Sequence, residues 1–262
     1  MTTKTLRPLL ALSLSALGCA AARPPAPATP RAKPAASAPA PAPALRSPDA
    51  ILADAVQATG GAAAWSAHKT MRLKFTTELV GMAMSAPVEH QQRRDDRALT
   101  TTNFPGIGLM REGFNGKTLW KQDPINGLRT LSGAEAEQSR VEDAWNLELE
   151  ARSLFAKIET APDAPPGLEC LTLTLKAGPP MRGCYDRRTH LQVSLEGTST
   201  TPQGDAPFRT TAGDWRQVGG VRIPYTSRTQ AGPVTFVNMV NEVTFDAPMD
   251  DKLFDPPAPG AP

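Results

Sequence analysis

Phe104-Pro-Gly-Ile-Gly-Leu-Met-Arg-Glu-Gly-Phe-Asn-Gly-Lys-Thr-Leu-Trp120 contains the hairpin signal that decides the fold of this chain. Asn115-Gly116 is typical of a type I′ turn, because both residue types tolerate the positive φ angles that this turn requires. The flanking segments 107–114 and 117–123 are strand candidates, and further candidates lie on both sides at short spacing. Consecutive strands joined by tight turns predict an antiparallel meander.

The meander begins where the hydrophobic period changes. Met71, Leu73, Phe75 and Leu79 alternate with polar residues, which predicts a strand that is buried on one face only. Further strands are expected at 83–94, 97–104 and 127–131, and then at 155–160, 168–176, 181–186, 190–197, 206–217, 221–230 and 233–245. The order along the chain is therefore helix, many strands, helix, many strands.

Two helical segments interrupt this series of strands. Ser47-Pro48-Asp49 supplies an N-cap, a proline at the first helical position and an acid in the first turn, and Gly60-Gly61 ends the helix. Apolar residues at helical spacing predict a second, amphipathic helix over 133–154, which must lie on the sheet. The candidate lid residues on this segment are Val141, Trp145 and Leu149.

This order predicts a mainly β (α+β) fold, a strongly curved antiparallel sheet whose concave face is covered by helices. A covered concave face is a natural pocket for an apolar ligand, and flexible methionines suit ligands of variable shape. Few polar residues are expected on the inner surface. The candidate cavity residues are Leu73, Phe75, Leu79, Met82, Met84, Phe104, Ile107, Leu109 and Met110. The alternative is that these residues fill a solid core.

The N-terminal segment reads as a secretion signal followed by a lipid attachment site. Residues 1–18 hold two basic residues and an apolar run that is too short to span a bilayer. Ala16-Leu17-Gly18-Cys19 resembles the lipobox of bacterial lipoproteins, whose cysteine is acylated. The alternative is an ordinary secretory signal with an incidental cysteine. The stretch after Cys19, to residue 46, is rich in Pro and Ala and predicts a disordered tether.

Charge and cysteine content narrow the class of protein. Two of the 28 Lys and Arg lie in the segment 1–18, so the other 26 balance the 26 Asp and Glu. A chain without excess positive charge lacks the basic surface that nucleic-acid binding requires. The charged run Arg93-Arg94-Asp95-Asp96-Arg97 is interpreted as a solvated hairpin end. Cys170 and Cys184 flank another hairpin signal, and after export they are expected to form a cross-strand disulfide.

Signals for catalysis, metals and cofactors are weak, and none of these is expected. His68, His90 and His190 lie far apart and outside any metal-ligand spacing, so each is interpreted as a surface or turn residue. Ser66-Ala-His-Lys69 matches the SxxK pattern of serine acyl-enzymes, but the partner motifs are absent. Asp250-Asp251 is interpreted as the cap of a terminal turn.

Several motifs together resemble the outer-membrane lipoprotein-sorting-like family. They include 104–120 and its continuation 123–133, the segments 52–65, 185–191 and 214–224, and the end, 242–254. The resemblance covers nearly all of residues 48–256. It implies the LolA/LolB-like fold, an incomplete β-barrel with a helical lid over an apolar cavity that receives acyl chains.

These observations predict a lipid-anchored outer-membrane lipoprotein that faces the periplasm and binds acyl chains, lipoproteins or another apolar ligand. The expected segments are a signal peptide (1–18), the lipidated cysteine with its tether (19–46), the folded domain (47–256) and a flexible tail (257–262). The alternative is a non-catalytic envelope module with a filled core, which binds a protein partner at an exposed edge.

Overall fold

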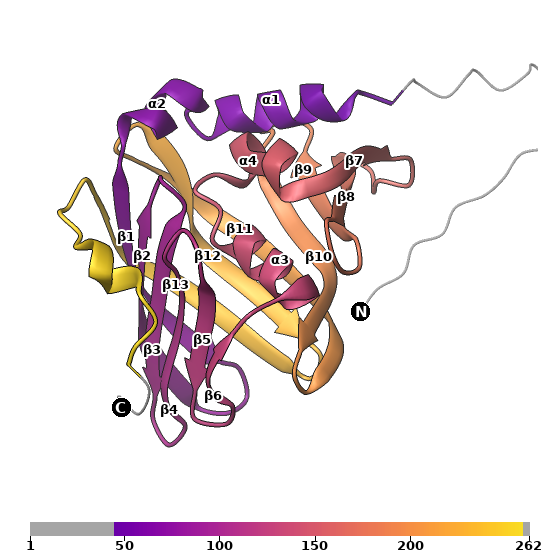
Figure 1. Cartoon of the computed structure of the whole chain (residues 1–262). Helices are drawn as coiled ribbons and strands as arrows, with labels where there is room; N and C mark the ends of the chain where they lie inside the picture. Colours follow the sequence, from indigo (N-terminus) through magenta and orange to yellow (C-terminus); the bar gives the residue numbers. More distant parts are fainter. Residues whose placement is uncertain (1–44, 259–262) are drawn as a thin grey trace, which may run out of the picture. The chain divides into compact units, whose positions relative to one another are not determined.

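The chain from Thr70 to Phe245 forms one antiparallel sheet of thirteen strands (Figure 1). A computed structural model describes residues 45–258, so the predicted signal, Cys19 and nearly all of the tether lie outside the described residues. The first six strands are β1 (Thr70–Leu79), β2 (Met84–Arg93), β3 (Arg97–Phe104), β4 (Gly108–Phe114), β5 (Leu119–Asp123) and β6 (Gly127–Thr130). The other seven are β7 (Phe155–Ala161), β8 (Leu168–Leu175), β9 (Met181–Asp186), β10 (Gln192–Thr201), β11 (Gly204–Val218), β12 (Val221–Ala231) and β13 (Val234–Phe245).

The strand order is β6-β5-β4-β3-β2-β1-β13-β12-β11-β10-β9-β8-β7. Consecutive strands pair within a first meander, β1 to β6, and within a second, β7 to β13, and the two meanders join where β1 pairs with β13. The edge strands β6 and β7 do not pair with each other, so the curved sheet stays open. The predicted mainly β fold and curved antiparallel sheet are confirmed.

Helices cover the concave face of this sheet. They are α1 (Pro48–Ala58), α2 (Gly61–Ala67), α3 (Gly133–Glu142) and α4 (Leu147–Leu154). Figure 1 shows α3 and α4 in the hollow of the sheet and α1 and α2 along one end of it. Within the described range, no helix is long and apolar enough to cross a membrane.

The first helix follows its sequence signals. Ser47 caps α1 by accepting a hydrogen bond from the Ala50 N–H, and Ile51, Leu52, Ala55 and Val56 are buried as predicted. The short helix α2 was not predicted, because the double glycine reads as a stop signal.

Gly60 makes the corner between α1 and α2 possible. Its φ is +116°, and a Cβ there would lie 2.5 Å from the carbonyl oxygen of Gly220 in the β11–β12 turn. The chain therefore bends at Gly60 and continues as a helix against that turn. The Arg222 N–H donates to the Thr59 carbonyl at 2.9 Å and holds the corner in place.

The predicted single helix over 133–154 is wrong in one respect, because it is two helices separated at residues 143–146. Asn146 starts the second helix by accepting a hydrogen bond from the Leu149 N–H at 2.9 Å. An asparagine side chain that caps a new helix competes with continuation of the old one. The break lets Trp145 turn into the core, where it is 6% exposed.

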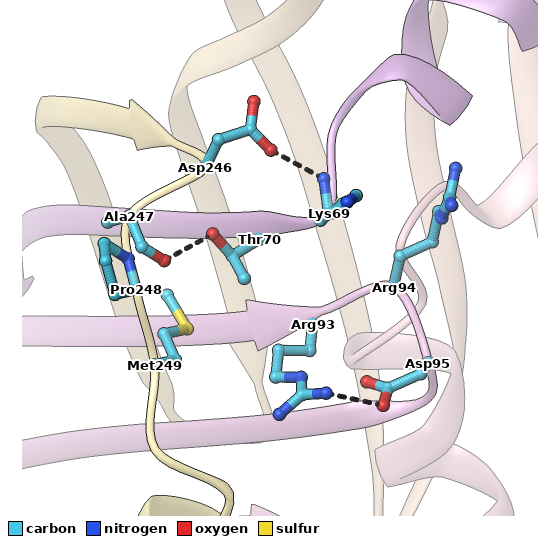
Figure 2. A pocket seen from close by; sticks show the side chains of 9 residues that line it. All are labelled: Lys69, Thr70, Arg93, Arg94, Asp95, Asp246, Ala247, Pro248 and Met249. Atoms are coloured by element: carbon cyan, nitrogen blue, oxygen red, sulfur yellow. Dashed lines mark hydrogen bonds and ion pairs between the residues drawn. The ribbon is translucent and has the colours of Figure 1, made fainter.

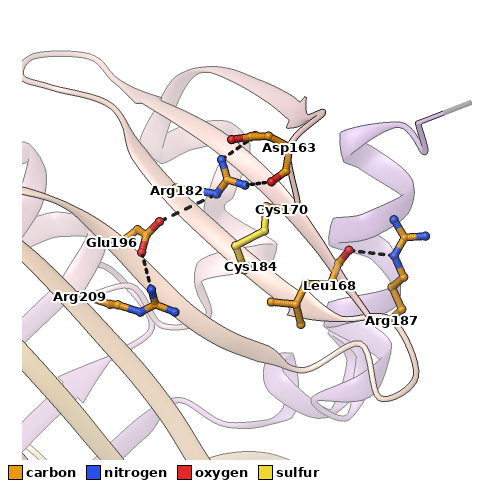
Figure 3. The surroundings of a disulfide bond; sticks show 8 residues. All are labelled: Asp163, Leu168, Cys170, Arg182, Cys184, Arg187, Glu196 and Arg209. Carbon is orange, nitrogen blue, oxygen red and sulfur yellow. Dashed lines mark hydrogen bonds and ion pairs between the residues drawn. A yellow bond between two sulfur atoms is a disulfide. The ribbon is translucent and has the colours of Figure 1, made fainter. Parts of the chain in front are cut away.

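The predicted disulfide is present. Cys170 on β8 and Cys184 on β9 are directly opposite each other in the register, and their Sγ atoms are bonded. Figure 3 shows the bridge on the sheet beside the ion pair of Arg182 with Asp163, which spans 2.8 Å. Both cysteines are buried next to Ala161, Leu168 and Val193. The bond thus fastens two strands close to the free edge at β7.

The C-terminal segment packs on the convex face of the first meander. The 3-10 helix η1 (Asp251–Phe254) places Phe254 against Leu99 and Trp120, and Trp120 Nε1 donates to the Phe254 carbonyl at 2.9 Å. Asp250 accepts a hydrogen bond from the Lys252 N–H, so the predicted cap of a terminal turn is confirmed. Trp120 lies flat over Gly113, where a Cβ would approach the ring to 2.6 Å.

Candidate ligand site on the concave face

We define the concave face as the face of the sheet that α3 covers. An apolar cluster lies on this face, at the end of the sheet that contains the β1–β2 turn. Leu79, Ala86 and Phe104 are its buried members, and the half-buried Met84, Met110, Val234 and Phe236 pack against them. The register explains the grouping, since Leu79 lies opposite both Met84 and Phe236. The cluster unites four of the nine candidate cavity residues: Leu79, Met84, Phe104 and Met110.

The other candidate cavity residues do not share this lining. Leu73 packs with the tryptophans beneath the lid, and Phe75 is half-buried in the middle of β1. Met82 and Ile107 lie in hairpin turns and are 58% and 41% exposed. Leu109 and Met110 are consecutive residues of β4, so their side chains point to opposite faces of the sheet. Only Met110 therefore faces the apolar cluster.

A row of polar side chains crosses the concave face next to the apolar cluster. The register places His90, Thr100, Glu112, Lys121 and Arg129 directly opposite one another on strands β2 to β6. His90 Nδ1 lies 2.9 Å from Thr100 Oγ1, and Lys121 Nζ lies 2.9 Å from Glu112 Oε2. The expectation of few polar residues on the inner surface is wrong, and His90 is a half-buried strand residue instead of a surface or turn residue.

The sequence contains a signal for this row that was missed. In β2 the inward positions change from Met84, Ala86 and Val88 to His90 and Gln92. In β4 they change in the same direction along the chain, from Met110 to Glu112. Alternation of apolar and polar residues shows which side chains of a strand point inward. The types of those inward residues then show where the apolar part of the face ends and the polar part begins.

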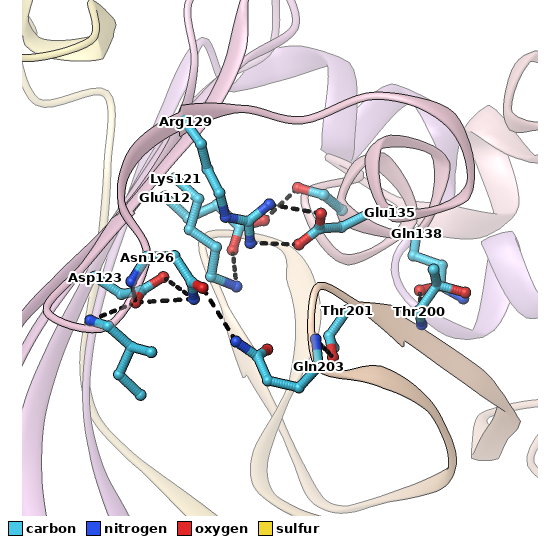
Figure 4. Close-up of polar contacts among 12 residues, drawn as sticks. Glu112, Lys121, Asp123, Asn126, Arg129, Glu135, Gln138, Thr200, Thr201 and Gln203 are labelled. Atoms are coloured by element: carbon cyan, nitrogen blue, oxygen red, sulfur yellow. Dashed lines mark hydrogen bonds and ion pairs between the residues drawn. The ribbon is translucent and has the colours of Figure 1, made fainter.

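Helix α3 rests on this polar row (Figure 4). Arg129 donates two hydrogen bonds of 2.6 Å to the carboxylate of Glu135, and Ser139 donates to Glu112. Charge-assisted and bidentate contacts of this kind are stronger than neutral hydrogen bonds. On the opposite side Gln138 donates to the Thr198 carbonyl of β10 and accepts from the Thr200 N–H at 2.9 Å. The helix therefore bridges the first meander and the β10 region of the second.

A further contact joins two hairpin tips across the opening. Gln203, in the β10–β11 turn, donates to Asn126, in the β5–β6 turn, at 3.1 Å (Figure 4). Asp123 fixes this second turn by accepting hydrogen bonds from the backbone of Ile125 and Asn126. Both meanders thus contact each other at α3 and at these tips, although their edge strands are not paired.

The predicted lid residues separate into two groups. Val141 is 5% exposed and belongs to the buried cluster of α1, α4 and strands β7 to β9, whereas Trp145 is 6% exposed and contacts Trp65 edge-to-face at 6.3 Å between ring centroids. Trp145 Nε1 also donates to the Trp65 carbonyl at 3.3 Å. Leu149 is 38% exposed and does not contribute to this packing. Of the three predicted lid residues, Val141 and Trp145 are therefore buried and Leu149 is not.

Two carboxyl groups at the end of α3 lie among other charges. Crowding by protein atoms and the charge of Glu112 raise the pKa of Glu142 to about 7, although Lys121 opposes the shift. Burial, together with Glu112 and Glu142, also raises the pKa of Asp143 well above its ordinary value. Glu142 is the last residue of α3 and Asp143 follows it before α4, so the stability of these two helices is expected to depend on pH.

The pH dependence has a defined sign. Because the pKa of Glu142 is raised in the fold, its neutral form is favoured there, and the associated stability is lost as the pH rises through about 7. Glu142→Gln should therefore exceed wild type in unfolding free energy by about 1 kcal/mol at pH 8, after allowance for solvent screening, and match it below the ordinary pKa of 4.5. Urea unfolding at several pH values measures the difference. Glu137→Gln on the same helix is the matched control, and the same pH trend in both variants would contradict the assignment.

The other residues considered for chemistry do not assemble into one site. His68 stacks on Phe245 and its Nδ1 lies 2.8 Å from Asp246 Oδ2, while His190 occupies the β9–β10 turn with a φ of +59°. Ser66 and Lys69 lie exposed at the end of α2 and just after it. Among residues 45–258 no group of three His, Cys, Asp or Glu side chains is arranged to hold a metal ion.

Comparison with known proteins supports the fold. No protein-family model and no curated protein sequence matches this chain. Among solved structures, a LolA superfamily protein from Nitrosomonas europaea matches with a TM-score of 0.52 and 11% identity, over 80% of this chain and 98% of that one.

Two further solved structures are similar over nearly their whole length. A DUF1329 family protein from Desulfovibrio piger matches with a TM-score of 0.52 and 13% identity, over 79% of this chain and 96% of that one. A domain assigned to outer membrane lipoprotein sorting, from Vibrio parahaemolyticus, matches with a TM-score of 0.51 and 12% identity, over 79% of this chain and 95% of that one. The chain therefore has the LolA/LolB-like fold, an open antiparallel barrel with a helical lid.

Proposed function

We propose that this protein is a lipid-anchored outer-membrane lipoprotein that faces the periplasm and binds acyl chains on its concave face. The acyl chains would belong to a lipid or a lipoprotein. The observation that carries this proposal is the apolar cluster around Leu79 and Phe104, whose members Met84, Met110 and Phe236 stay half-buried beneath the open side of the sheet. The helices leave this apolar surface partly uncovered, so a ligand that covers it removes apolar area from water, which favours binding.

The fold likeness and the polar row support the same reading. Complete burial of an acyl chain of about twelve methylenes contributes roughly 10 kcal/mol to the binding free energy, before the entropic cost of ordering the chain. The polar row ends the apolar surface at His90 and Glu112, so it limits how far an apolar chain extends beneath α3. Binding and release then require only that the lid segment move. The protein supplies burial and no catalytic step.

The second candidate is an envelope interaction module that binds a protein partner. It is favoured by the helix-covered part of the concave face, where Trp65, Trp145 and Val221 form a closely packed cluster with little room for a ligand. In this case the fold would serve as a rigid support, and the surface would carry the function.

Ligand content distinguishes the two candidates. The full chain carrying Cys19→Ser, purified from the periplasm without denaturant, should retain lipid that native mass spectrometry and lipid extraction detect in about one copy per chain. It should also take up an apolar dye saturably, and Met110→Glu on the apolar cluster should reduce the uptake. A lipid-free protein that rejects the dye would favour the interaction module.

The lid role of Trp145 gives a kinetic expectation. Trp145→Leu keeps an apolar side chain but removes the edge-to-face contact with Trp65 and the indole hydrogen bond, which together contribute about 1–2 kcal/mol. A bound apolar dye should therefore dissociate about tenfold faster, as measured by stopped-flow fluorescence. Trp215→Leu, on β11, is the matched control. Equal dissociation rates in wild type and Trp145→Leu would show that this segment does not retain the ligand.

A further inference from the structure

A hollow lies outside the concave face, at the end of the sheet where β1 begins and β2 ends (Figure 2). Its volume is about 450 Å³, and the segment after β13 forms one of its walls. The register places Lys69 opposite Arg94, whose N–H donates to the Lys69 carbonyl at 3.0 Å. The Thr70 hydroxyl donates to the Ala247 carbonyl at 2.8 Å and so ties β1 to the segment after β13. One backbone and one side-chain hydrogen bond thus hold the walls together.

The two acids that line this hollow are already paired. Asp246 accepts a hydrogen bond from the Lys69 N–H at 2.7 Å and contacts His68 Nδ1 at 2.8 Å. Asp95 lies 2.9 Å from Arg93 and also contacts Arg97. Both carboxylates are therefore compensated by groups that hold the turns in place.

Two cations of the hollow keep their charge available. Arg94 donates to the carbonyl oxygen of Ser66, which carries no net charge, and both Arg94 and Lys69 have exposed side chains. Among residues 45–258 no carboxylate forms an ion pair with the ammonium of Lys69 or the guanidinium of Arg94. Both residues line the same side of the hollow (Figure 2). A guanidinium and an ammonium on one side of a hollow suit a tetrahedral oxyanion, because together they offer several donors to one centre of negative charge.

The wall formed by the segment after β13 is apolar. It consists of Ala247, Pro248 and Met249, which face the cations across the hollow (Figure 2). An anion without an apolar part would contact only one side of such a site, whereas an amphiphilic anion would contact both.

We propose that this hollow is a binding site for a phosphate group, carried by a lipid head group or present as a free phosphate. Lys69 and Arg94 would contact the phosphate oxygens, and Met249 and Pro248 would contact the adjoining hydrocarbon of a lipid. The site is separate from the apolar cluster and does not depend on the function proposed for that cluster.

The test uses the full chain carrying Cys19→Ser, so that no acyl anchor takes part. Binding is measured for inorganic phosphate, for dihexanoyl phosphatidylglycerol below its micelle concentration, and for sodium acetate at equal ionic strength. Lys69→Gln/Arg94→Gln removes the two cations, and Lys69→Gln alone leaves the Arg94 contact with Ser66 intact. Lys176→Gln/Arg188→Gln removes the same charge from two other turns and is the matched control.

The phosphate probes should bind more tightly than acetate, and the Lys69→Gln/Arg94→Gln variant should lose at least about tenfold in affinity while the control keeps wild-type affinity. Lys69→Gln alone should lose part of this affinity with unchanged thermal stability. Tighter binding of the short-chain lipid than of inorganic phosphate identifies a lipid head group as the source, and equal binding identifies free phosphate. Equal losses in the variant and the charge-matched control, or no binding of either phosphate probe, would overturn the proposal.

Discussion

Phe254→Ala should lower the unfolding free energy by about 3–5 kcal/mol, although the residue lies only a few positions from the end of the chain. Its side chain is 0% exposed and fills the space between Leu99 and Trp120 on the convex face. Removal of the ring leaves a cavity in a close-packed cluster that cannot easily collapse, because Trp120 is fixed by its position over Gly113. The C-terminal segment is therefore a structural part of the domain.

Denaturant unfolding followed by tryptophan fluorescence measures this effect, since Trp120 reports directly on the cluster. The matched control is Ile125→Ala, which removes an apolar side chain that is 80% exposed and should change stability by less than about 0.5 kcal/mol. If the two variants were equally stable, the convex-face packing of η1 would not exist in solution.

Loss of the Cys170–Cys184 disulfide should lower the unfolding free energy by about 3 kcal/mol. The bond closes a loop with a sequence separation of 14, which limits the unfolded chain, and it joins two strands near the unpaired edge at β7. The Cys170→Ala/Cys184→Ala variant suits this test, because alanine leaves no thiol or hydroxyl in an apolar environment beside Ala161 and Leu168.

The same loss should follow from reduction of the wild-type protein. Unfolding curves of the oxidised protein, the reduced protein and the alanine variant should place the last two together and well below the first. A reduced protein as stable as the oxidised one would show that the strands are held without the bond.

Most of the strands could be predicted from the sequence because their signals are local. The alternation from Met71 to Leu79 and the hairpin signal at Asn115-Gly116 each act within a few residues, so distant contacts changed little. The hairpin is present, but the expected type I′ turn is wrong, because only Gly116 of the pair has a positive φ (+85°). Where a prediction failed, a distant residue decided the outcome. The chain continues as helix α2 because Gly60 packs closely against the Gly220 carbonyl of the β11–β12 turn. No pattern in the neighbouring residues predicts that contact.

The candidate site was predicted less well, for a geometric reason. Assigning apolar residues to a cavity requires the face of each strand and its register, and neighbours such as Leu109 and Met110 differ in face although they are equally apolar. The polar row was missed because its members are separated along the chain and become adjacent only through strand pairing. Asn146 did carry a local signal, a capping residue before Glu148 and Glu150, that marks the start of α4.

The pairing of β1 with β13 has a consequence for the order of folding. The Lys69 N–H donates to Asp246, which lies 177 positions later, so the junction of the two meanders needs nearly the whole domain to be present. Contacts of such long sequence separation make folding slow, because the chain loses much conformational entropy before they form. Until the last strand arrives, β1 offers a bare hydrogen-bonding edge to any neighbouring chain. We therefore expect the folding chain to need protection from association with other copies until β13 has paired with β1.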